Sequence, residues 1–369
     1  MEHSTHLRVV IAGGGTGGHV YPGIAVARRL QGRRPGTDVQ FLGLKGGQEA
    51  HLVPREGFPL HTVMVRPLKG RSTLAQGGAL GALGIGTLQA LRFLRYVRPH
   101  LVIGTGGYVM GPAMLAATLL RIPRVILEQN LVPGIAVRTL ARWAHVVFTS
   151  FPETATYLPK VRVEYTGTPV RQEICDIAAI DTPEDEKHLH VLICGGSQGA
   201  HRLNQTVFEA LPRLLPQHQR LRMVHQTGAA DYEAVVQAYR HTCLHVQVAP
   251  FLYDMAEHYR WAHVVICRAG ASTLAELTAC GKPAVLIPYP YAADDHQQLN
   301  AFALQEQGAA QVILESDLTA ERLAETILTL LTQPEQLRQQ RERSRRLGRP
   351  QAADAIVTSC LQLLGIPAD

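Results

Sequence analysis

The amino-acid sequence contains one local pattern twice, about half a chain apart. An apolar strand, Leu7 to Ala12, runs into the glycine-rich turn GGTGG at residues 14–18, and an amphipathic helix follows. A second apolar strand, Val191 to Cys194, runs into GGSQG at residues 195–199, and another amphipathic helix follows. A repeat with so long a period indicates two similar domains rather than a solenoid. Since strand, glycine turn and helix open a Rossmann-like fold, we predict two doubly wound, parallel α/β domains.

The length of the chain agrees with this division. At 369 residues it exceeds what a single hydrophobic core usually organises. The stretch IDTPEDEKH, residues 180–188, is acid-rich, contains proline and directly precedes the second strand. Such composition is typical of a junction between domains.

The segment from Val264 to Ala301 has the parts of a nucleotide-sugar pocket. An apolar strand turns at Gly270 into a helix, and a second apolar strand follows Pro283. The backbone N–H groups at such a helix start attract phosphate. Glu276, one turn into the helix, can accept hydrogen bonds from two ribose hydroxyls, and the amides of Gln297, Gln298 and Asn300 suit sugar hydroxyls. A purely structural βαβ unit is the alternative interpretation.

Polar or glycine-rich loops also follow three predicted strands of the first half. The first is the GGTGG turn, the second is Gly104 to Tyr108, and the third is Glu128 to Asn130. Because the carboxyl ends of parallel strands share one edge of a sheet, we expect these loops to lie together. The first turn also fits the dinucleotide pattern GxGxxG, but Asp38 begins the next strand instead of ending it, which argues against NAD.

Composition narrows the class of protein. A hydrophobic content of 46%, a charged content of 18% and a mean hydropathy of +0.01 are typical of a soluble globular protein. We expect no secretory signal, because the N-terminus runs directly into a strand, and no apolar run has the length of a membrane span. The six cysteines lack zinc spacing and are interpreted as reduced core thiols of a cytoplasmic protein.

The net charge of +6 raises the question of an anionic partner. The basic residues lack interleaved aromatics and form no known nucleic-acid motif, so we predict no nucleic-acid partner. An anionic membrane surface or a pyrophosphate substrate explains the charge instead. One segment, Leu74 to Val97, is strongly apolar and ends beside Arg92, Arg95 and Arg98. It is predicted to be either one or two core helices interrupted by glycines or a surface that docks on an anionic bilayer.

The motifs together resemble the MurG family of UDP-N-acetylglucosamine (UDP-GlcNAc) transferases of peptidoglycan synthesis. The resemblance runs in order through nearly the whole chain, in the following segments: GGGTGGHVYPGIAVA (13–27), GTGGYVMGP (104–112), EQN (128–130), TGTPVR (166–171), GGSQGAHRLN (195–204), RAGASTLAE (268–276) and HQQLNA (296–301). It implies the GT-B fold, two Rossmann-like domains facing across a cleft. We place the first domain at 1–170, the second at 171–345, and in 346–369 a helix that packs back on the first domain.

The resemblance implies a UDP-GlcNAc site mainly on the second domain. Ser197 is expected at the pyrophosphate, Glu276 at the ribose, the backbone near Leu252 at the uracil, and Arg171 near the diphosphate. Gln297, ahead of Gln298, is expected at the GlcNAc hydroxyls, although some relatives differ at the preceding His296. The remaining expected donor contacts are Thr16, Gly17, Gly18, Asn130, Ala271, Ser272, Thr273, Leu274 and Ala275.

The implied reaction transfers GlcNAc, with inversion, to the C4 hydroxyl of MurNAc in undecaprenyl-pyrophosphoryl-MurNAc-pentapeptide (lipid I), giving lipid II and UDP. The implied acceptor contacts are Thr16, His19, Tyr108, Glu128 and Asn130. Either His19 or Glu128 is expected to be the catalytic base, and the sequence leaves that choice open. The chain has no DxD motif, so we expect no tightly bound metal and no cofactor. Helix N-termini and Arg171 are expected to stabilise the leaving pyrophosphate instead.

Two other functions remain open at this point. One is a UDP-GlcNAc 2-epimerase-like enzyme, which needs no acceptor loops or membrane-docking patch. The other is a non-catalytic nucleotide-sugar-binding protein. For the transferase, the expected partners are UDP-GlcNAc, the lipid-linked acceptor, an anionic membrane surface and proteins of cell-wall synthesis. Its expected location is cytoplasmic, on the inner face of the cell membrane.

Overall fold

The structure is a computed structural model that describes residues 6–65, 73–179, 187–196 and 198–367. Its internal contacts divide the chain into two compact units. Unit 1 comprises Met1–Arg171 and Gln351–Asp369, and unit 2 comprises Gln172–Pro350. Most of the predicted acid-rich junction, residues 180–186, and the predicted pyrophosphate contact Ser197 lie outside the described residues.

Unit 1 is built on a parallel sheet of seven strands in the order β3-β2-β1-β4-β5-β6-β7. The strands are β1 (Arg8–Gly13), β2 (Asp38–Leu44), β3 (Leu60–Val63), β4 (Leu101–Gly106), β5 (Arg124–Glu128), β6 (Val146–Thr149) and β7 (Val163–Tyr165). The order runs outwards in both directions from β1 and β4, which is the doubly wound pattern. The central strands are buried on both faces and are therefore apolar throughout, as in Val9 to Ala12.

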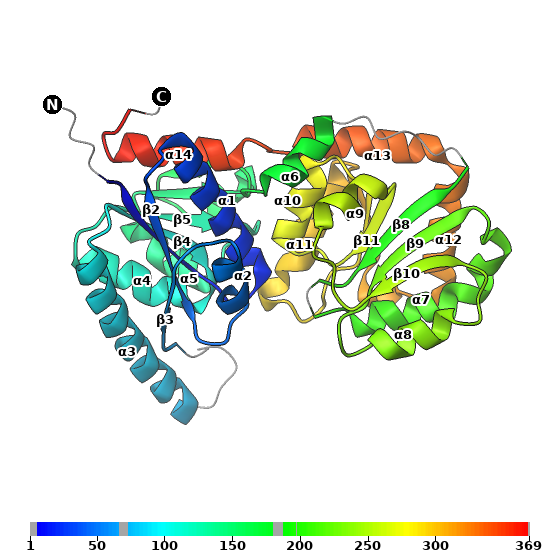
Figure 1. Cartoon of the computed structure of the whole chain (residues 1–369), viewed down its shortest axis with the longest axis horizontal. Helices are drawn as coiled ribbons and strands as arrows, with labels where there is room; N and C mark the ends of the chain where they lie inside the picture. Colours follow the sequence, from blue (N-terminus) through cyan, green and yellow to red (C-terminus); the bar gives the residue numbers. More distant parts are fainter. Residues whose placement is uncertain (1–5, 66–72, 180–186, 197, 368–369) are drawn as a thin grey trace. The chain divides into compact units, whose positions relative to one another are not determined.

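Helices cover both faces of this sheet (Figure 1). Odd-numbered residues of β1 pack with α1 (Gly17–Arg33), α2 (Glu49–Arg55) and α14 (Ala352–Leu363). Even-numbered residues of β1 pack with α3 (Thr73–Val97), α4 (Gly107–Leu119) and α5 (Ile135–Leu140). This alternation follows from the two-residue period of a strand. Short 3₁₀ turns lie at Ala141–Trp143 and Pro152–Tyr157.

The last helix of the chain, α14, packs against the first, α1. Figure 1 shows the two helices side by side on unit 1. Ile356 and Val357 of α14 are fully buried in the core that α1 covers. Asp354 of α14 accepts a charged hydrogen bond from Arg29 at 2.6 Å and pairs with Arg33 at 3.2 Å. These contacts explain why the C-terminal residues belong to unit 1.

The apolar segment at 74–97 forms part of a single continuous helix, α3, despite its glycines. Ala90 and Leu94 lie in the core, so the helix has a buried face. Ile85, Leu88 and Tyr96 remain 49%, 62% and 86% exposed. The helix therefore combines features of both interpretations, since one face packs in the core and another presents apolar side chains to solvent.

Unit 2 is built on a parallel sheet of six strands in the order β10-β9-β8-β11-β12-β13. The strands are β8 (Leu189–Cys194), β9 (Leu221–Gln226), β10 (His245–Ala249), β11 (Val264–Cys267), β12 (Ala284–Leu286) and β13 (Ala310–Val312). The first glycine turn follows β1 and the second follows β8, and each of these strands is central in its own sheet. The sequence repeat therefore corresponds to a structural one.

Helices also cover both faces of the second sheet (Figure 1). One face packs with α7 (His201–Leu214), α8 (Tyr232–Tyr239) and α12 (Ala320–Thr332). The other helices are α6 (Gln172–Cys175), α9 (Met255–Trp261), α10 (Ala271–Ala279), α11 (His296–Glu306) and α13 (Pro334–Leu347), and they contact one another in pairs such as α10 with α13. The remaining 3₁₀ turns are Asp176–Ala179, Leu215–Gln217, Ala293–Asp295 and Glu315–Asp317.

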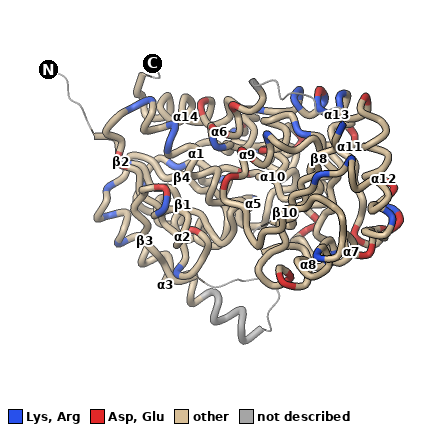
Figure 2. The backbone as a smooth tube through the Cα atoms, turned by 45° about the vertical axis from the view of Figure 1, so that its right-hand side comes forward, with Lys and Arg blue, Asp and Glu red and all other residues tan. Residues whose placement is uncertain are grey.

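The last part of the chain forms three successive helices, α12, α13 and α14. α12 ends before Pro334, and α13 ends at Leu347, directly before Gly348, where any side chain would overlap the carbonyl oxygen of Thr278. The arginine-rich α13 presents the basic segments seen in Figure 2. Two of its arginines also have packing roles, because Arg345 covers Gly281 and Arg343 covers Gly308. None of the described helices is both long enough and apolar enough to span a membrane.

Candidate functional site

Two glycine-rich loops of unit 1 pack directly against each other at the carboxyl ends of β1 and β4. A side chain at Gly107, which has a φ of +75°, would overlap the carbonyl oxygen of Gly14. A Cβ at Gly106 would lie 2.5 Å from Cδ2 of His19. Glycine is therefore required at both positions, because the backbone of one loop touches the other loop. The two sequence motifs form one structural feature.

His19 is held in the first turn of α1 by this loop. Its Nδ1 lies 3.1 Å from the carbonyl oxygen of Gly14 and 3.4 Å from Oγ1 of Thr16. Because a carbonyl oxygen only accepts hydrogen bonds, the contact to Gly14 requires the proton on Nδ1. In the neutral ring, Nε2 then carries the basic lone pair. The loop thus selects the tautomer that a general base needs.

A buried carboxylate, Glu49, supports the same loop through hydrogen bonds to its backbone. It was not predicted from the sequence. The side chain belongs to α2, and the residue is 0% exposed. Its Oε2 accepts from the backbone N–H of Gly15 at 2.8 Å, and its Oε1 accepts from that of Leu44 at 2.7 Å. A side chain at Gly14 would overlap the carboxylate. Glu49 therefore fixes the backbone that in turn orients His19.

Glu128 and Asn130 come together at the carboxyl end of β5. Oε1 of Glu128 accepts from the backbone N–H of Asn130 at 2.9 Å and from its side-chain amide at 3.1 Å. Oε2 accepts from the backbone N–H of Gly134 at 3.2 Å. The neighbouring Gln129 donates to the carbonyl oxygen of Thr105 at 2.9 Å, which joins this loop to the end of β4. Glu128 therefore anchors residues 128–134 as a compact turn.

Burial changes the titration of Glu128. The side chain is 4% exposed, and the loss of solvation raises its pKa to about 7. The hydrogen bonds from Asn130, Gly134 and Gln129 favour the ionised form and act in the opposite direction. A pKa near 7 is suited to a general base, but both carboxylate oxygens are engaged in holding the loop. Geometry and pKa thus point to different roles for this residue.

The other predicted residues of unit 1 lie near these loops or on α1. Thr16 is exposed and precedes α1, while Gly17 and Gly18 form its first turn. Tyr108 lies in the first turn of α4 and is 48% exposed, so its ring is presented to solvent rather than packed beneath the loop. The Arg171 guanidinium lies 4.4 Å from the ring centroid of Tyr21 on α1, a cation–π arrangement.

The second glycine turn, in unit 2, is also defined by close backbone packing. A side chain at Gly199 would overlap the carbonyl oxygen of Thr227, and one at Gly228 would overlap that of Gln198. Both glycines have a φ of +80°. The turn after β8 is therefore pressed against the turn after β9, as the turns after β1 and β4 are in unit 1.

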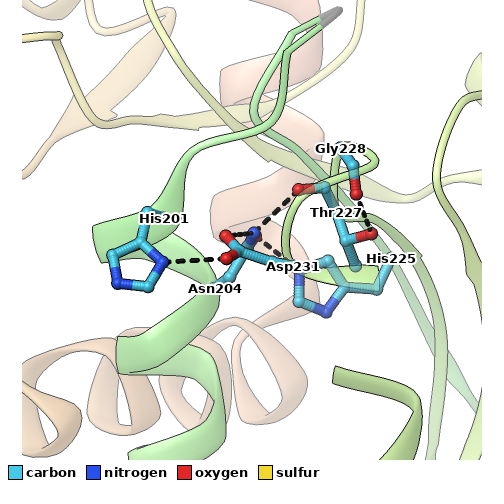
Figure 3. A network of polar contacts seen from close by, with 6 residues as sticks. All are labelled: His201, Asn204, His225, Thr227, Gly228 and Asp231. Carbon is cyan, nitrogen blue, oxygen red and sulfur yellow. Dashed lines mark hydrogen bonds and ion pairs between the residues drawn. The ribbon is translucent and has the colours of Figure 1, made fainter. Parts of the chain in front are cut away.

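A chain of buried polar side chains supports this turn (Figure 3). The Asn204 amide donates to the carbonyl oxygen of Thr227 and to Asp231, each at 2.8 Å. Its Oδ1 lies 3.1 Å from Nε2 of His225, whose Nδ1 lies 3.1 Å from the hydroxyl of Tyr239. Burial lowers the pKa of His225 to about 4, so its ring is neutral and donates from Nε2 to Asn204. Because His225 is neutral, it fixes which groups donate and which accept along this network of hydrogen bonds.

Asp231 completes the network on the solvent side. Partial burial acts to raise the pKa of the Asp231 carboxyl. Hydrogen bonds from His201 and Asn204 act to lower it, and the net shift is downwards. His201 Nδ1 lies 2.9 Å from Oδ1 of Asp231. His225, Asp231 and Tyr239 were missed in the sequence analysis, and Asn204 appeared there only as the last residue of a motif. The available signal was a polar residue, Asn204, on the apolar side of an amphipathic helix.

The N-terminus of α10 lies at the carboxyl end of β11, next to β8 in the sheet. Ala271, Ser272 and Thr273 form its first turn and are partly exposed. Leu274 is 2% exposed, so its side chain is not presented to a ligand. Leu252 follows β10 and is 6% exposed, so its side chain is likewise buried. Ala275 is partly exposed.

Glu276 lies on the same helix and is oriented by a tyrosine. The Tyr259 hydroxyl donates to its Oε2 at 3.0 Å. Tyr259, on α9, is 1% exposed and was not identified from the sequence. A carboxylate fixed in this way can accept hydroxyl donors in one geometry.

Gln297 and Gln298 lie in the first turn of α11. Gln297 Oε1 accepts from the backbone N–H of Tyr289 at 3.0 Å, so the side chain ties the preceding loop to the helix. Both glutamines are partly exposed. Asp294 and Asp295, directly before the helix, have φ values of +54° and +51°. Two consecutive left-handed residues other than glycine are strained and frequently mark functional loops.

The described residues contain no group of three or more His, Cys, Asp or Glu side chains that could hold a metal ion. The groups gathered at the two strand-end edges include backbone N–H groups, amides, hydroxyls, histidines and carboxylates. Such a set suits phosphate and sugar hydroxyls.

Comparisons with known proteins agree with this chemistry. Residues 9–149 match the glycosyltransferase family 28 N-terminal domain, and residues 190–356 match the glycosyltransferase family 28 C-terminal domain. A relative from Anaeromyxobacter sp. (strain Fw109-5), named UDP-N-acetylglucosamine--N-acetylmuramyl-(pentapeptide) pyrophosphoryl-undecaprenol N-acetylglucosamine transferase, is 46% identical over 97% of this chain and 94% of its own length.

Solved structures extend the comparison to the fold. The crystal structure of Acinetobacter baumannii MurG matches with a TM-score of 0.76 and 34% identity, over 97% of this chain and 99% of that chain. A UDP-N-acetylglucosamine 2-epimerase matches with a TM-score of 0.70 at 15% identity, over 99% of this chain and 98% of that chain, which is a likeness of fold alone. The chain therefore has the GT-B fold and belongs to the MurG family within glycosyltransferase family 28.

Proposed function

We propose that this protein is an inverting glycosyltransferase that moves GlcNAc from UDP-GlcNAc to the C4 hydroxyl of the MurNAc sugar in undecaprenyl-pyrophosphoryl-MurNAc-pentapeptide. The observation that carries the proposal is a relative named for this transfer, which is 46% identical to this protein over 97% of the chain. The chemistry of the two units supports it, because unit 2 offers groups for a nucleotide sugar and unit 1 offers a histidine suited to accept a proton.

On the donor side, UDP-GlcNAc binds to the carboxyl edge of the unit 2 sheet. The backbone near Leu252 contacts the uracil, Glu276 accepts the ribose hydroxyls, and Gln297 with Gln298 contacts the sugar. The N-terminal turn of α10, together with the glycine turn after β8, receives the pyrophosphate. These N–H groups and Arg171 supply positive potential where charge develops on the departing UDP.

On the acceptor side, the C4 hydroxyl attacks the anomeric carbon as its proton passes to a base. His19 fits that role better than Glu128, because its loop fixes the neutral tautomer with the lone pair on Nε2. Glu128 is engaged by Asn130 and Gly134, so we assign it the positioning of the 128–134 turn. Thr16, Tyr108 and Asn130 lie on the same three strand-end loops and are the remaining acceptor contacts.

We infer that the protein works at the cytoplasmic face of an anionic membrane, where a lipid-linked acceptor would lie. The exposed apolar side chains of α3, Ile85, Leu88 and Tyr96, support docking, as do the exposed arginines at 92, 95 and 98 in and after the last turns of the helix. A single amphipathic surface with basic flanks binds a bilayer through apolar insertion and electrostatic attraction together. Proteins of cell-wall synthesis are further proposed partners.

The proposed function is tested by measuring UDP release from UDP-GlcNAc with and without a short-chain analogue of the lipid-linked acceptor. The transferase releases UDP only when the analogue is present. Release without acceptor, together with formation of ManNAc, would instead indicate epimerase chemistry. Donor binding without any turnover would indicate a binding protein.

Replacing His19 with alanine should lower kcat by about 100-fold or more, because general base catalysis typically contributes 10²- to 10⁴-fold. The affinity for UDP should change by less than about threefold, since the donor groups assigned above lie mainly in unit 2. Steady-state kinetics and UDP titration measure the two effects separately. His51→Ala, at an exposed histidine of α2, is the matched control. Near-normal turnover in His19→Ala would return the role of base to Glu128.

The raised pKa of Glu128 predicts a pH-dependent cost to folding. The native pKa of about 7 lies above the ordinary value of 4.5, so the native state binds more protons between these pH values. The free energy of unfolding therefore falls as pH rises through this window, by about 3 kcal/mol for a shift of this size. Glu128→Gln removes this dependence, so its stability relative to the parent protein should rise between pH 5 and pH 8.

Urea unfolding at several pH values measures this difference. The chain has two tryptophans, Trp143 in unit 1 and Trp261 in unit 2, so a Trp261→Phe background lets fluorescence report on unit 1 alone. Glu153→Gln controls for the loss of one surface carboxylate. A stability difference that stays flat from pH 5 to pH 8 would contradict the assigned protonation of Glu128.

Removing the three basic charges at the end of α3 should weaken membrane binding. Arg92, Arg95 and Arg98 replaced together by glutamine should lower the affinity for vesicles containing anionic phospholipid by at least about tenfold at low salt, since each basic residue contributes about 1 kcal/mol near such a surface. Sedimentation with vesicles measures the affinity. The control replaces the exposed Arg338, Arg346 and Arg349 by glutamine, with the same change of net charge. Equal losses in both triple variants would count against a docking surface at α3.

A further inference from the structure

The carboxylate that we assign to the donor ribose is held by a residue with no assigned role. Glu276 lies on α10 and Tyr259 on α9, and both helices contact α6 in unit 2. The Tyr259 hydroxyl donates a hydrogen bond to Oε2 of Glu276 at 3.0 Å. The direction is fixed, because an ionised carboxylate only accepts.

Tyr259 is well suited to be a permanent donor. It is among the largest fully buried side chains of the described residues, with 1% of its surface exposed. Burial, followed by the nearby negative charge of Glu276, raises the pKa of the Tyr259 hydroxyl well above its usual range. The phenol therefore keeps its proton at any pH at which the protein works. Its ring cannot turn away without a vacancy in the core.

The surroundings of the pair strengthen this contact. The thiols of Cys194, Cys267 and Cys280 lie close enough to Tyr259 to affect its titration, and all three cysteines are buried. Thiols are weak hydrogen-bonding groups, so the Tyr259 hydroxyl lies in surroundings of low polarity, while Glu276 itself is partly exposed. A hydrogen bond to a charged group is stronger there than in water. One oxygen of Glu276 is therefore directed towards Tyr259 on α9.

We propose that Tyr259 is a positioning residue for ribose recognition, orienting the Glu276 carboxylate so that it accepts the ribose hydroxyls of the nucleotide donor. This inference rests on the proposed function, because it takes Glu276 to be the ribose-binding group. It adds the element that makes Glu276 selective. An unrestrained glutamate side chain would rotate freely. Ordering it on binding would then cost conformational entropy, which would reduce the affinity gained from each ribose hydroxyl.

A merely structural role for Tyr259 makes a different prediction. If the hydroxyl only satisfies a buried polar group, its removal lowers stability and leaves the preference for ribose unchanged. If it orients Glu276, its removal lowers the preference for ribose over deoxyribose. The two roles therefore separate in a ratio of rates, which does not depend on the fraction of folded enzyme.

The test compares UDP-GlcNAc with its 2′-deoxy and 3′-deoxy analogues in the parent protein and in Tyr259→Phe. In the parent, loss of a hydroxyl that bonds to a carboxylate should reduce kcat/KM by about tenfold to a hundredfold for at least one analogue. The discrimination ratio is kcat/KM for UDP-GlcNAc divided by kcat/KM for the deoxy analogue. In Tyr259→Phe this ratio should fall at least about fivefold, and the loss of kcat/KM for UDP-GlcNAc should appear mainly as a higher KM. An unchanged ratio in a folded Tyr259→Phe would overturn the proposal.

Tyr239→Phe is the matched control. Tyr239 is also a buried tyrosine of unit 2, but its hydroxyl bonds to Nδ1 of His225 at 3.1 Å and not to Glu276. Its variant should keep the parent ratio whatever its melting temperature. If Tyr259→Phe does not fold, Tyr259→Met also removes the hydroxyl that bonds to Glu276. A fall in discrimination in the folded Tyr259→Met protein is the expected result, and unchanged discrimination there would overturn the proposal.

The experiment also distinguishes failure of this inference from failure of the proposed function. Absence of any transfer by the parent protein would refute the function itself. Transfer by the parent protein without discrimination between ribose and deoxyribose would refute the ribose-binding role of Glu276, and this inference with it, but not the transferase function. Discrimination that persists in Tyr259→Phe would refute only the positioning role of Tyr259.

Discussion

The direct contact of backbone with backbone at paired glycine turns is the constraint on which both candidate sites depend. In unit 1, Gly107 meets the carbonyl oxygen of Gly14, and in unit 2, Gly199 meets that of Thr227. In each case the turns follow neighbouring strands at the carboxyl edge of a parallel sheet. No side chain larger than hydrogen fits at these contacts. The glycines therefore bring N–H groups and carbonyls together where a ligand of a doubly wound sheet binds.

Such turns carry backbone polar groups that need partners, and buried side chains supply them. Glu49 accepts from the N–H of Gly15, and Asn204 donates to the carbonyl oxygen of Thr227. Tyr259 plays a similar part for a side chain, Glu276. The functional edge of each sheet thus consists of a solvent-facing layer and a buried polar layer that fixes it. Loss of a residue from the buried layer leaves a polar group without its partner in the core, which is costly.

The sequence predicted the parallel α/β class and the GT-B resemblance because strand, glycine turn and helix are local patterns. It also placed the loops of His19, Glu128 and Glu276 at strand ends. It could not find Glu49, His225 or Tyr259, since each acts through a partner distant along the chain, such as Gly15 for Glu49. The hydrogen bonds that engage both oxygens of Glu128 could also not be predicted, because they depend on how the 128–134 turn folds. The assigned ligand contacts themselves, Ser197 among them, remain predictions.

The chemical structure of the product is the most direct test of the central claim. After incubation with UDP-GlcNAc and the short-chain lipid-linked acceptor, the product should be isolated and its sugar linkage determined by NMR. We predict a single disaccharide in which GlcNAc is β-linked to C4 of MurNAc, as inversion of the α-linked donor requires. An α-linked product, attachment at another hydroxyl, or free ManNAc as the only sugar product would contradict the account.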